Sequence, residues 1–129
     1  MKVRKIEGKD RSRLEAILGA QNHFRPGEVK VASELIDIAL TQAGQEDYII
    51  HCAEGDEGLV LGYICYGKAP LTDAVYDLYW IVVHPAFHNQ GVGTLLLRHG
   101  EEKMKRRQAR LLLIETSSLP PYASSRRLQ

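Results

Sequence analysis

A short loop with two glycines, His88–Thr94, is the stretch of the sequence best suited to binding chemistry, and it leads directly into the apolar run Leu95–Leu97. Glycine allows the backbone to approach a ligand closely. The first N–H groups of a helix have no partner within the helix, and the helix dipole favours negative charge at that end. A glycine-containing loop that opens a helix therefore predicts a phosphate-binding site.

The segment ahead of the loop has the composition of a buried strand. Asp77–Val83 is rich in apolar, aromatic and β-branched residues, and Pro85 ends it because proline cannot donate to a sheet ladder. Beyond the loop, a helix is predicted from about Gly91 to Arg107, followed by a second buried strand at 110–116. A helix that links two strands in this way makes a parallel pair.

The chain upstream of this unit is predicted to supply a strand, two helices and a hairpin. Apolar periodicity and turn residues give their positions. They are an edge strand at 3–6, a helix capped by Asp10, a second helix that begins near Glu28 and is closed by Gly44, and a hairpin of 48–53 and 59–66.

The central motif resembles a known family. Val82-Val83-His84-Pro85, followed by His88-Asn89-Gln90-Gly91-Val92-Gly93, resembles motif A of the GNAT acetyltransferase superfamily, Q/R-x-x-G-x-G/A. Both glycines are present, and His88 stands where the family usually has Gln or Arg. The resemblance covers nearly the whole chain. It implies the GNAT acyl-CoA N-acyltransferase fold, an α/β (α+β) fold with a mixed sheet flanked by helices, in one domain over residues 1–129.

The same resemblance implies acetyl-CoA as co-substrate and a primary amine as acceptor, in a small molecule, a peptide or a protein. In the family, the strand splays from its parallel neighbour and its backbone pairs with pantetheine; here those groups belong to Ile81, Val82 and Val83. The Val83 N–H is the matching oxyanion donor. The pyrophosphate contacts match the amides of His88, Asn89, Gln90, Gly91, Val92, Gly93 and Thr94, and the Thr94 hydroxyl.

Asp77 matches the place where the histone-acetylating branch of the family carries its general-base Glu. Asp is one methylene shorter, so it would act through water. The alternative is a solvated carboxylate on a strand. His88 either contacts phosphate or only covers the loop, and His84, beside Pro85, is interpreted as a turn residue.

The resemblance also implies a C-terminal truncation, because family members continue with two more strands. Pro120–Arg126 is predicted to start a fourth helix, with proline in its first turn. Tyr122–Arg126 resembles the opening of motif B, which puts Gln129 where many members carry the Tyr that protonates the leaving thiolate. Slow turnover is therefore expected. The strand at 111–114 would keep an unpaired edge, which predicts a homodimer.

The composition of the chain limits the partners, metal sites and cellular locations that we expect. The net charge of +1 predicts no nucleic-acid partner and no binding to an anionic membrane. Two cysteines, Cys52 and Cys65, lie in apolar runs without metal-ligand spacing, so buried thiols and no metal are expected. With no signal peptide or membrane-spanning run, a cytoplasmic location is predicted.

Three functions compete at this stage. The first is an acetyl-CoA-dependent N-acetyltransferase. The second is an acetyl-CoA-binding or dimerising remnant of the family with little turnover. The third, a dinucleotide-binding unit with Glu115 on the ribose, requires G-x-G-x-x-G, and we reject it because Leu96 occupies the place of the third glycine.

Overall fold

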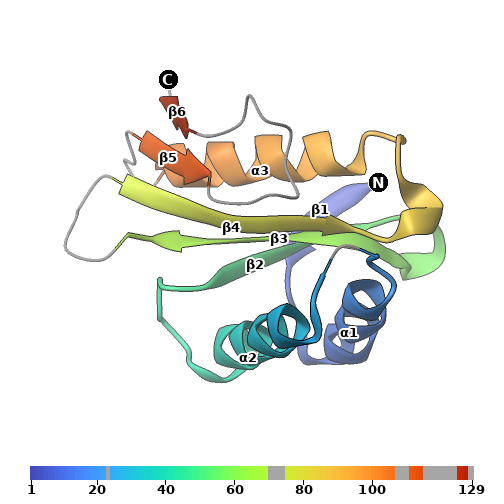
Figure 1. Cartoon of the computed structure of the whole chain (residues 1–129). Helices are drawn as coiled ribbons and strands as arrows, with labels where there is room; N and C mark the ends of the chain where they lie inside the picture. The colour runs from blue at the N-terminus through green and yellow to red at the C-terminus, as the bar shows by residue number, and fades with distance from the viewer. Residues whose placement is uncertain (23, 70–74, 107–110, 115–124, 128–129) are drawn as a thin grey trace.

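A six-stranded sheet forms the centre of the computed structural model, which describes residues 1–22, 24–69, 75–106, 111–114 and 125–127 (Figure 1). The strands lie in chain order. Neighbouring strands are antiparallel except for β4 and β5, which are parallel as predicted. The strands are β1 (Lys2–Lys5), β2 (Ile49–Glu54), β3 (Val60–Lys68), β4 (Val75–Val83), β5 (Leu111–Ile114) and β6 (Ser125–Arg127).

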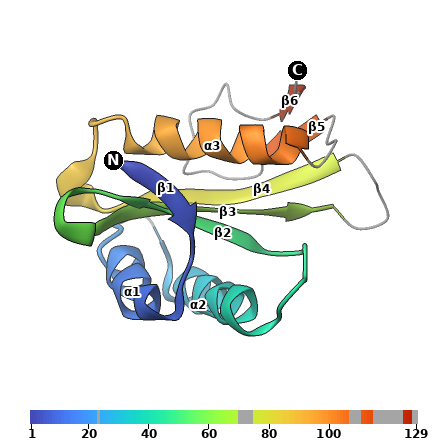
Figure 2. The same ribbon diagram turned by 180° about the vertical axis from the view of Figure 1, so that it is seen from behind.

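Helices cover both faces of the sheet (Figures 1 and 2). Helix α3 (Val92–Arg106) lies on one face, and α1 (Arg11–Gly19) and α2 (Pro26–Thr41) lie on the other. Short 3₁₀ helices in the described ranges are η1 (Gly8–Asp10), η2 (Asp56–Gly58) and η3 (Pro85–Phe87). This is the mixed sheet flanked by helices that the sequence predicts, with helix bounds within a few residues of those expected.

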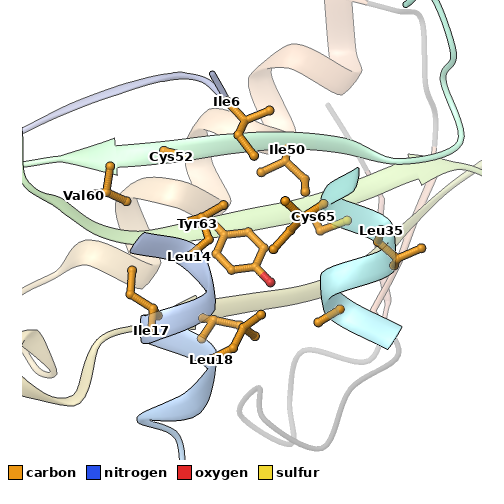
Figure 3. Close-up of a cluster of buried hydrophobic side chains, with 13 residues drawn as sticks. Ile6, Leu14, Ile17, Leu18, Leu35, Ile50, Cys52, Val60, Tyr63 and Cys65 are labelled. Carbon is orange, nitrogen blue, oxygen red and sulfur yellow. The ribbon is translucent and has the colours of Figure 1, made fainter. Parts of the chain in front are cut away.

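Each face of the sheet has its own hydrophobic core. Leu78, Leu96 and Met104 are fully buried in the cluster under α3. The cluster under α1 and α2 is shown in Figure 3, where Leu14, Ile17 and Leu18 of α1 face the buried strand residues. Burial of such side chains stabilises the fold by about 1.5–3 kcal/mol each.

The two cysteines belong to the second core. Cys52 of β2 and Cys65 of β3 are free and fully buried. Removal from water raises the pKa of the Cys52 thiol to about 12, and burial raises that of Cys65 still further above its ordinary value. Both groups are therefore neutral thiols at physiological pH, as the sequence predicts.

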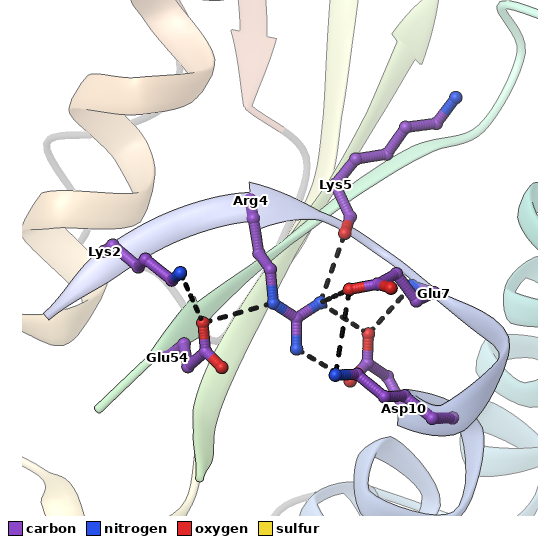
Figure 4. A network of polar contacts seen from close by, with 7 residues as sticks. Lys2, Arg4, Lys5, Glu7, Asp10 and Glu54 are labelled. Carbon is purple, nitrogen blue, oxygen red and sulfur yellow. Dashed lines mark hydrogen bonds and ion pairs between the residues drawn. The ribbon is translucent and has the colours of Figure 1, made fainter. Parts of the chain in front are cut away.

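Asp10 does not cap α1 through its side chain, contrary to the sequence-based expectation. Its carboxylate accepts hydrogen bonds from Arg4 Nη1 and Nη2, at 2.8 and 2.9 Å, and from the Glu7 N–H at 2.8 Å. Figure 4 shows Arg4 between Asp10 and Glu54. The charge of the Arg4 guanidinium outcompetes the exposed amides of the helix end, because charge-assisted bonds are the stronger ones.

The C-terminal expectations need two corrections. The helix predicted at Pro120–Arg126 is not formed at its described end, because Ser125–Arg127 is a strand, and 120–124 lie outside the described residues. The edge of β5 is not left open, because β6 pairs with it from Leu113↔Ser125 to Leu111↔Arg127. Extended pairing satisfies the backbone groups of β5, which a helix in this place would not do.

Candidate functional site

The strand that precedes the loop extends beyond the described part of its parallel partner. The described pairing of β4 with β5 runs from Val75↔Leu111 to Leu78↔Ile114, so the segment from Tyr79 to Val83 lies past that pairing. On its other side, β4 stays paired with β3 as far as Gly62↔Val83. The expected divergence of the two parallel strands stays a prediction, because the residues that follow Ile114 lie outside the described part of the chain.

A β-bulge lies next to Leu78 in β4. Cys65 pairs with Trp80 and Tyr66 pairs with Leu78, so Tyr79 is an extra residue in β4. Tyr79 and Trp80 both pack against the core under α1 and α2, and the Trp80 Nε1–H donates to Tyr63 Oη at 2.9 Å. A bulge bends a strand and increases its twist. The bulge therefore bends β4 at the point where its described pairing with β5 ends, which sequence alone did not reveal.

The alternation of the β3–β4 ladder decides which backbone groups of β4 face away from β3. The His84 N–H donates to Leu61 O at 2.9 Å, so this is a hydrogen-bonded pair. Hydrogen-bonded and non-hydrogen-bonded pairs alternate in an antiparallel ladder. The backbone groups of Val82 are consequently directed towards β3, whereas those of Ile81 and Val83 are directed away from it. Two of the three residues predicted to pair with pantetheine have the required orientation.

Close contact between β3 and β4 fixes the position of this strand end. A Cβ atom on Gly62 would lie 2.5 Å from Val82 O and 3.0 Å from Val83 Cα. Only glycine allows such an approach without moving the β4 backbone. Gly62 is therefore a residue of the site that our sequence interpretation missed, although a glycine inside a strand is a recognised signal of close approach.

The carbonyl of Val83 is already engaged by two side chains. Gln21 Nε2 donates to Val83 O at 2.9 Å and to Ile17 O at 3.0 Å. His88 Nε2 lies 2.9 Å from the same Val83 oxygen, so the proton of this bond is on Nε2. This bond supports the interpretation that His88 covers the loop, and a contact of His88 with phosphate stays a prediction.

The loop itself adopts a conformation that requires glycine at one position. Gly91 has φ +80° and Asn89, a residue type that tolerates this region, has φ 64°. Gly91 O accepts the Leu95 N–H at 3.0 Å, which is the first bond of α3. The N–H groups of the four residues from Gly91 to Thr94 accordingly have no partner within the helix. Buried Val92 anchors this end against the core.

Gly93 needs no special backbone angle. A Cβ atom there would make ordinary contacts of 3.9 Å with Ile81 and Val83. The fold itself would accept alanine at this position, so the absence of a side chain fits a ligand that approaches the backbone. His88, Asn89, Gln90, Gly91 and Thr94 are exposed, and these loop residues are therefore accessible from solvent.

His84 has a local structural role, as the sequence indicates. Its Nδ1 accepts a hydrogen bond from the Ala86 N–H at 3.1 Å at the start of η3. A ring nitrogen engaged in this way stabilises the turn between β4 and the loop.

Asp77 lies well away from the other predicted catalytic group. It is partly buried in β4, opposite Gly67, and six residues before Val83. At the rise of a strand, six residues span about 20 Å. Burial, with the charge of Asp77, raises the pKa of the nearby Tyr79 phenol to about 12. Asp77 and the Val83 N–H therefore do not converge on one atom, and a base role for Asp77 requires intervening water.

A separate cavity of about 290 Å³ lies beside the start of β2. Tyr48, His51 and Lys103 are among its lining residues, and no predicted site residue lines it. Within the described ranges, three or more His, Cys, Asp or Glu side chains are nowhere grouped as a metal site would need. The helices of the same ranges are too short or too polar to cross a membrane.

Comparisons with known proteins agree with this fold. The model of the acetyltransferase (GNAT) family matches residues 14–122. A GNAT-family protein from Desulfovibrio desulfuricans is 33% identical with a TM-score of 0.83, over 95% of this chain and 77% of that one. The search of curated proteins gives no match.

Two more distant structures share the fold. The ribosomal-protein-S18-alanine N-acetyltransferase from Escherichia coli is 20% identical, with a TM-score of 0.70 over 95% of this chain and 70% of that one. A GNAT acetyltransferase from Brucella melitensis, solved in complex with acetyl-CoA, is 21% identical, with a TM-score of 0.72 over 99% of this chain and 88% of that one.

Proposed function

Because this chain belongs to the GNAT acetyltransferase family, we propose that it transfers an acetyl group from acetyl-CoA to a primary amine. Membership of the family indicates acyl transfer in general. The observation that supports the finer proposal is the arrangement of the end of β4 and the loop. The backbone groups of Ile81 and Val83 face away from β3, and a glycine-containing helix start follows them. Residues 1–129 would form one domain of this kind.

Acetyl-CoA supplies the activated thioester, and the chain supplies its placement. The N–H groups from His88 to Thr94, with the Thr94 hydroxyl, would hold the pyrophosphate, since unpaired amides at a helix start favour anions. Ile81 and Val83 would pair with pantetheine along the side of β4 that faces away from β3. The Val83 N–H would donate to the developing oxyanion, and one such donor lowers the activation free energy by about 2.7–4 kcal/mol. Placing the thioester beside the amine can lower it by up to about 7–11 kcal/mol more. Val82, directed towards β3, would contribute packing rather than backbone pairing.

The acceptor would be an amine of a small molecule, a peptide or a protein. The E. coli structural neighbour is named for the alanine of ribosomal protein S18, and another neighbour is an aminoglycoside 6'-N-acetyltransferase. Both names describe amine substrates. The charge balance of +1 supports neither a nucleic-acid partner nor an anionic membrane. A cytoplasmic location and a homodimer remain predictions, and the dimer has lost the support of an open β5 edge.

A second candidate is an acetyl-CoA-binding or dimerising family member with little or no turnover. The observation that favours it is Gln129, which matches the place of the Tyr that protonates the leaving thiolate in many family members. Gln129 lies outside the described residues. General acid catalysis contributes about 10²–10⁴-fold to rate, so its loss would leave binding intact and turnover slow.

One experiment separates the two candidates. Acetyl-CoA binding is measured by calorimetry, and acetylation of a panel of small amines and peptides is followed by mass spectrometry. Acetylation above the uncatalysed rate supports the first candidate, and binding without acetylation supports the second. Asp77→Asn should lower any observed rate by about 10²-fold or more if Asp77 is the base. The absence of acetyl-CoA binding would contradict both.

A further inference from the structure

One backbone oxygen connects three segments of the site. Val83 O accepts Gln21 Nε2, which follows α1, and His88 Nε2, which follows η3, each at 2.9 Å. Val83 itself is the last residue of β4. The end of the first helix, the end of the central strand and the start of the loop therefore meet at a single acceptor.

Both lone pairs of this oxygen are in use, since a carbonyl accepts two hydrogen bonds. The same peptide unit is also held at its other polar end, because the His84 N–H donates to Leu61 O at 2.9 Å. Gln21 is held in turn by its second bond, to Ile17 O at 3.0 Å. The peptide plane between Val83 and His84 is thus fixed at both ends by groups that belong to the protein.

On this basis, and resting on the proposed function, we infer that Gln21 is a positioning residue for the acyl-CoA site. Together with His88 it occupies Val83 O, so a ligand beside Val83 has only the N–H of this residue to pair with. The ligand therefore places a carbonyl oxygen there, and not an amide N–H. Gln21 acts through the Val83–His84 peptide, which sets the direction in which the loop leaves the strand.

The test compares two glutamines that each make two hydrogen bonds to the backbone. Gln45 also makes two bonds, donating to Tyr48 O at 2.7 Å and accepting from the Tyr48 N–H at 2.8 Å, but it lies between α2 and β2. Gln21→Leu and Gln45→Leu are prepared in the full chain, and coenzyme A binding is measured by calorimetry. Loss of one hydrogen bond predicts about 3–10-fold weaker binding for Gln21→Leu. Gln45→Leu should bind as the unchanged chain does.

A second pair of variants tests the donors directly and does not depend on Gln21→Leu being folded. His88 is exposed, so His88→Ala and His88→Gln should both fold. His88→Ala removes the donor to Val83 O and should weaken coenzyme A binding several-fold. His88→Gln supplies an amide donor in its place and should recover most of the affinity.

The outcomes distinguish this inference from the proposed function. If the unchanged chain fails to bind coenzyme A, the proposed function is wrong. If the unchanged chain binds, and Gln21→Leu binds equally well, the role of Gln21 is overturned. Equal weakening by Gln21→Leu and Gln45→Leu would also overturn it, because a general loss of stability would then explain both. If Gln21→Leu does not fold, equal affinities of the two His88 variants overturn the inference.

Discussion

Two polar clusters attach the sheet to its surroundings, and they are built differently. The Arg4 cluster, at one edge of the sheet, consists of Lys2, Arg4, Glu7, Asp10 and Glu54 (Figure 4). It uses full charges, and Asp10 is only 3% exposed. The Val83 cluster, at the end of β4, consists of Gln21, Val83 and His88 and uses a neutral amide, a carbonyl and an exposed imidazole.

The difference indicates how much each cluster contributes to the stability of the fold. Breaking a buried ion pair costs about 3–5 kcal/mol, since the remaining charge is left without compensation. A neutral hydrogen bond contributes only about 0.5–1.5 kcal/mol. The Arg4 cluster is therefore expected to contribute more to the stability of the fold than the Val83 cluster. The Val83 cluster fixes the end of β4 through contacts that each contribute little to stability, so its effect is expected on ligand binding.

The largest effect is expected from the Arg4 cluster. Asp10→Ala leaves the Arg4 guanidinium without its two short bonds, and the free energy of unfolding should fall by about 3 kcal/mol in a urea titration. Coenzyme A affinity of the folded variant should stay unchanged, because β2 and β3 lie between the Arg4 cluster at β1 and the end of β4. If Asp10→Ala weakened coenzyme A binding by more than its loss of stability explains, the two clusters would not differ in function as we expect.

The next effect separates backbone strain from ligand binding. Gly91 and Gly44 both have φ +80° with open space around a Cβ atom. Leucine at either position should lower the free energy of unfolding by about 1–2 kcal/mol. Only Gly91→Leu should also weaken coenzyme A binding, by about tenfold or more, equivalent to ~1.4 kcal/mol. Unequal stability losses, or weaker binding in Gly44→Leu, would show that the glycines are not matched.

The pH dependence of stability should carry the signature of Asp10. Burial raises the pKa of this carboxyl, but the Arg4 hydrogen bonds and the Glu7 N–H outweigh burial, so the folded-state pKa lies below its ordinary value. A lowered folded-state pKa gives stability that is present above the unfolded-state pKa, near 4, and is lost as the pH falls through the folded-state value. Between about pH 6 and pH 3, a range that spans the ordinary pKa of an Asp side chain, denaturant titrations should show that the free energy of unfolding depends less on pH in Asp10→Asn than in the unchanged chain.

The smallest effect is expected from a pair that resembles Arg4–Asp10 in geometry. Arg11 bonds Asp37 through two nitrogens, at 2.7 and 3.1 Å, but the two side chains are 41% and 50% exposed. Water and salt screen such a pair. Arg11→Met should therefore change stability much less than Asp10→Ala, and added salt should reduce the change further. Equal effects would mean that geometry, and not burial, determines the strength of these pairs.

Local patterns predicted the part of the site that is continuous in sequence. The strand ending at Val83, the loop with Gly91 and the helix after it follow one another, and turn and helix-start chemistry placed all three. The role of Gln21 was not predicted, because its partner, Val83, is 62 residues away. The sequence contains no periodic signal for a contact of that separation.

The sequence-based predictions that were wrong or missing have the same origin, a contact with another segment. Asp10 has the residue type of a helix cap, but tertiary contact with Arg4 overrides that local preference. Ser125–Arg127 follows prolines that favour a helix start, yet pairing with β5 decides its conformation. Tyr79 gives no sign of being an extra residue until the registers on its two sides are compared. In each case the deciding partner lies in another segment of the chain.

The burial of both cysteines bears on the thiol chemistry of the proposed reaction. Coenzyme A, the proposed co-product, carries a free thiol, and a protein thiolate would attack its oxidised form to give a mixed disulfide. Cys52 and Cys65 are fully buried, with pKa values far above neutral, so neither supplies that thiolate. The chain should remain unmodified when it is incubated with the disulfide form of coenzyme A. A cysteine introduced on its surface should accept a maleimide label at that single position.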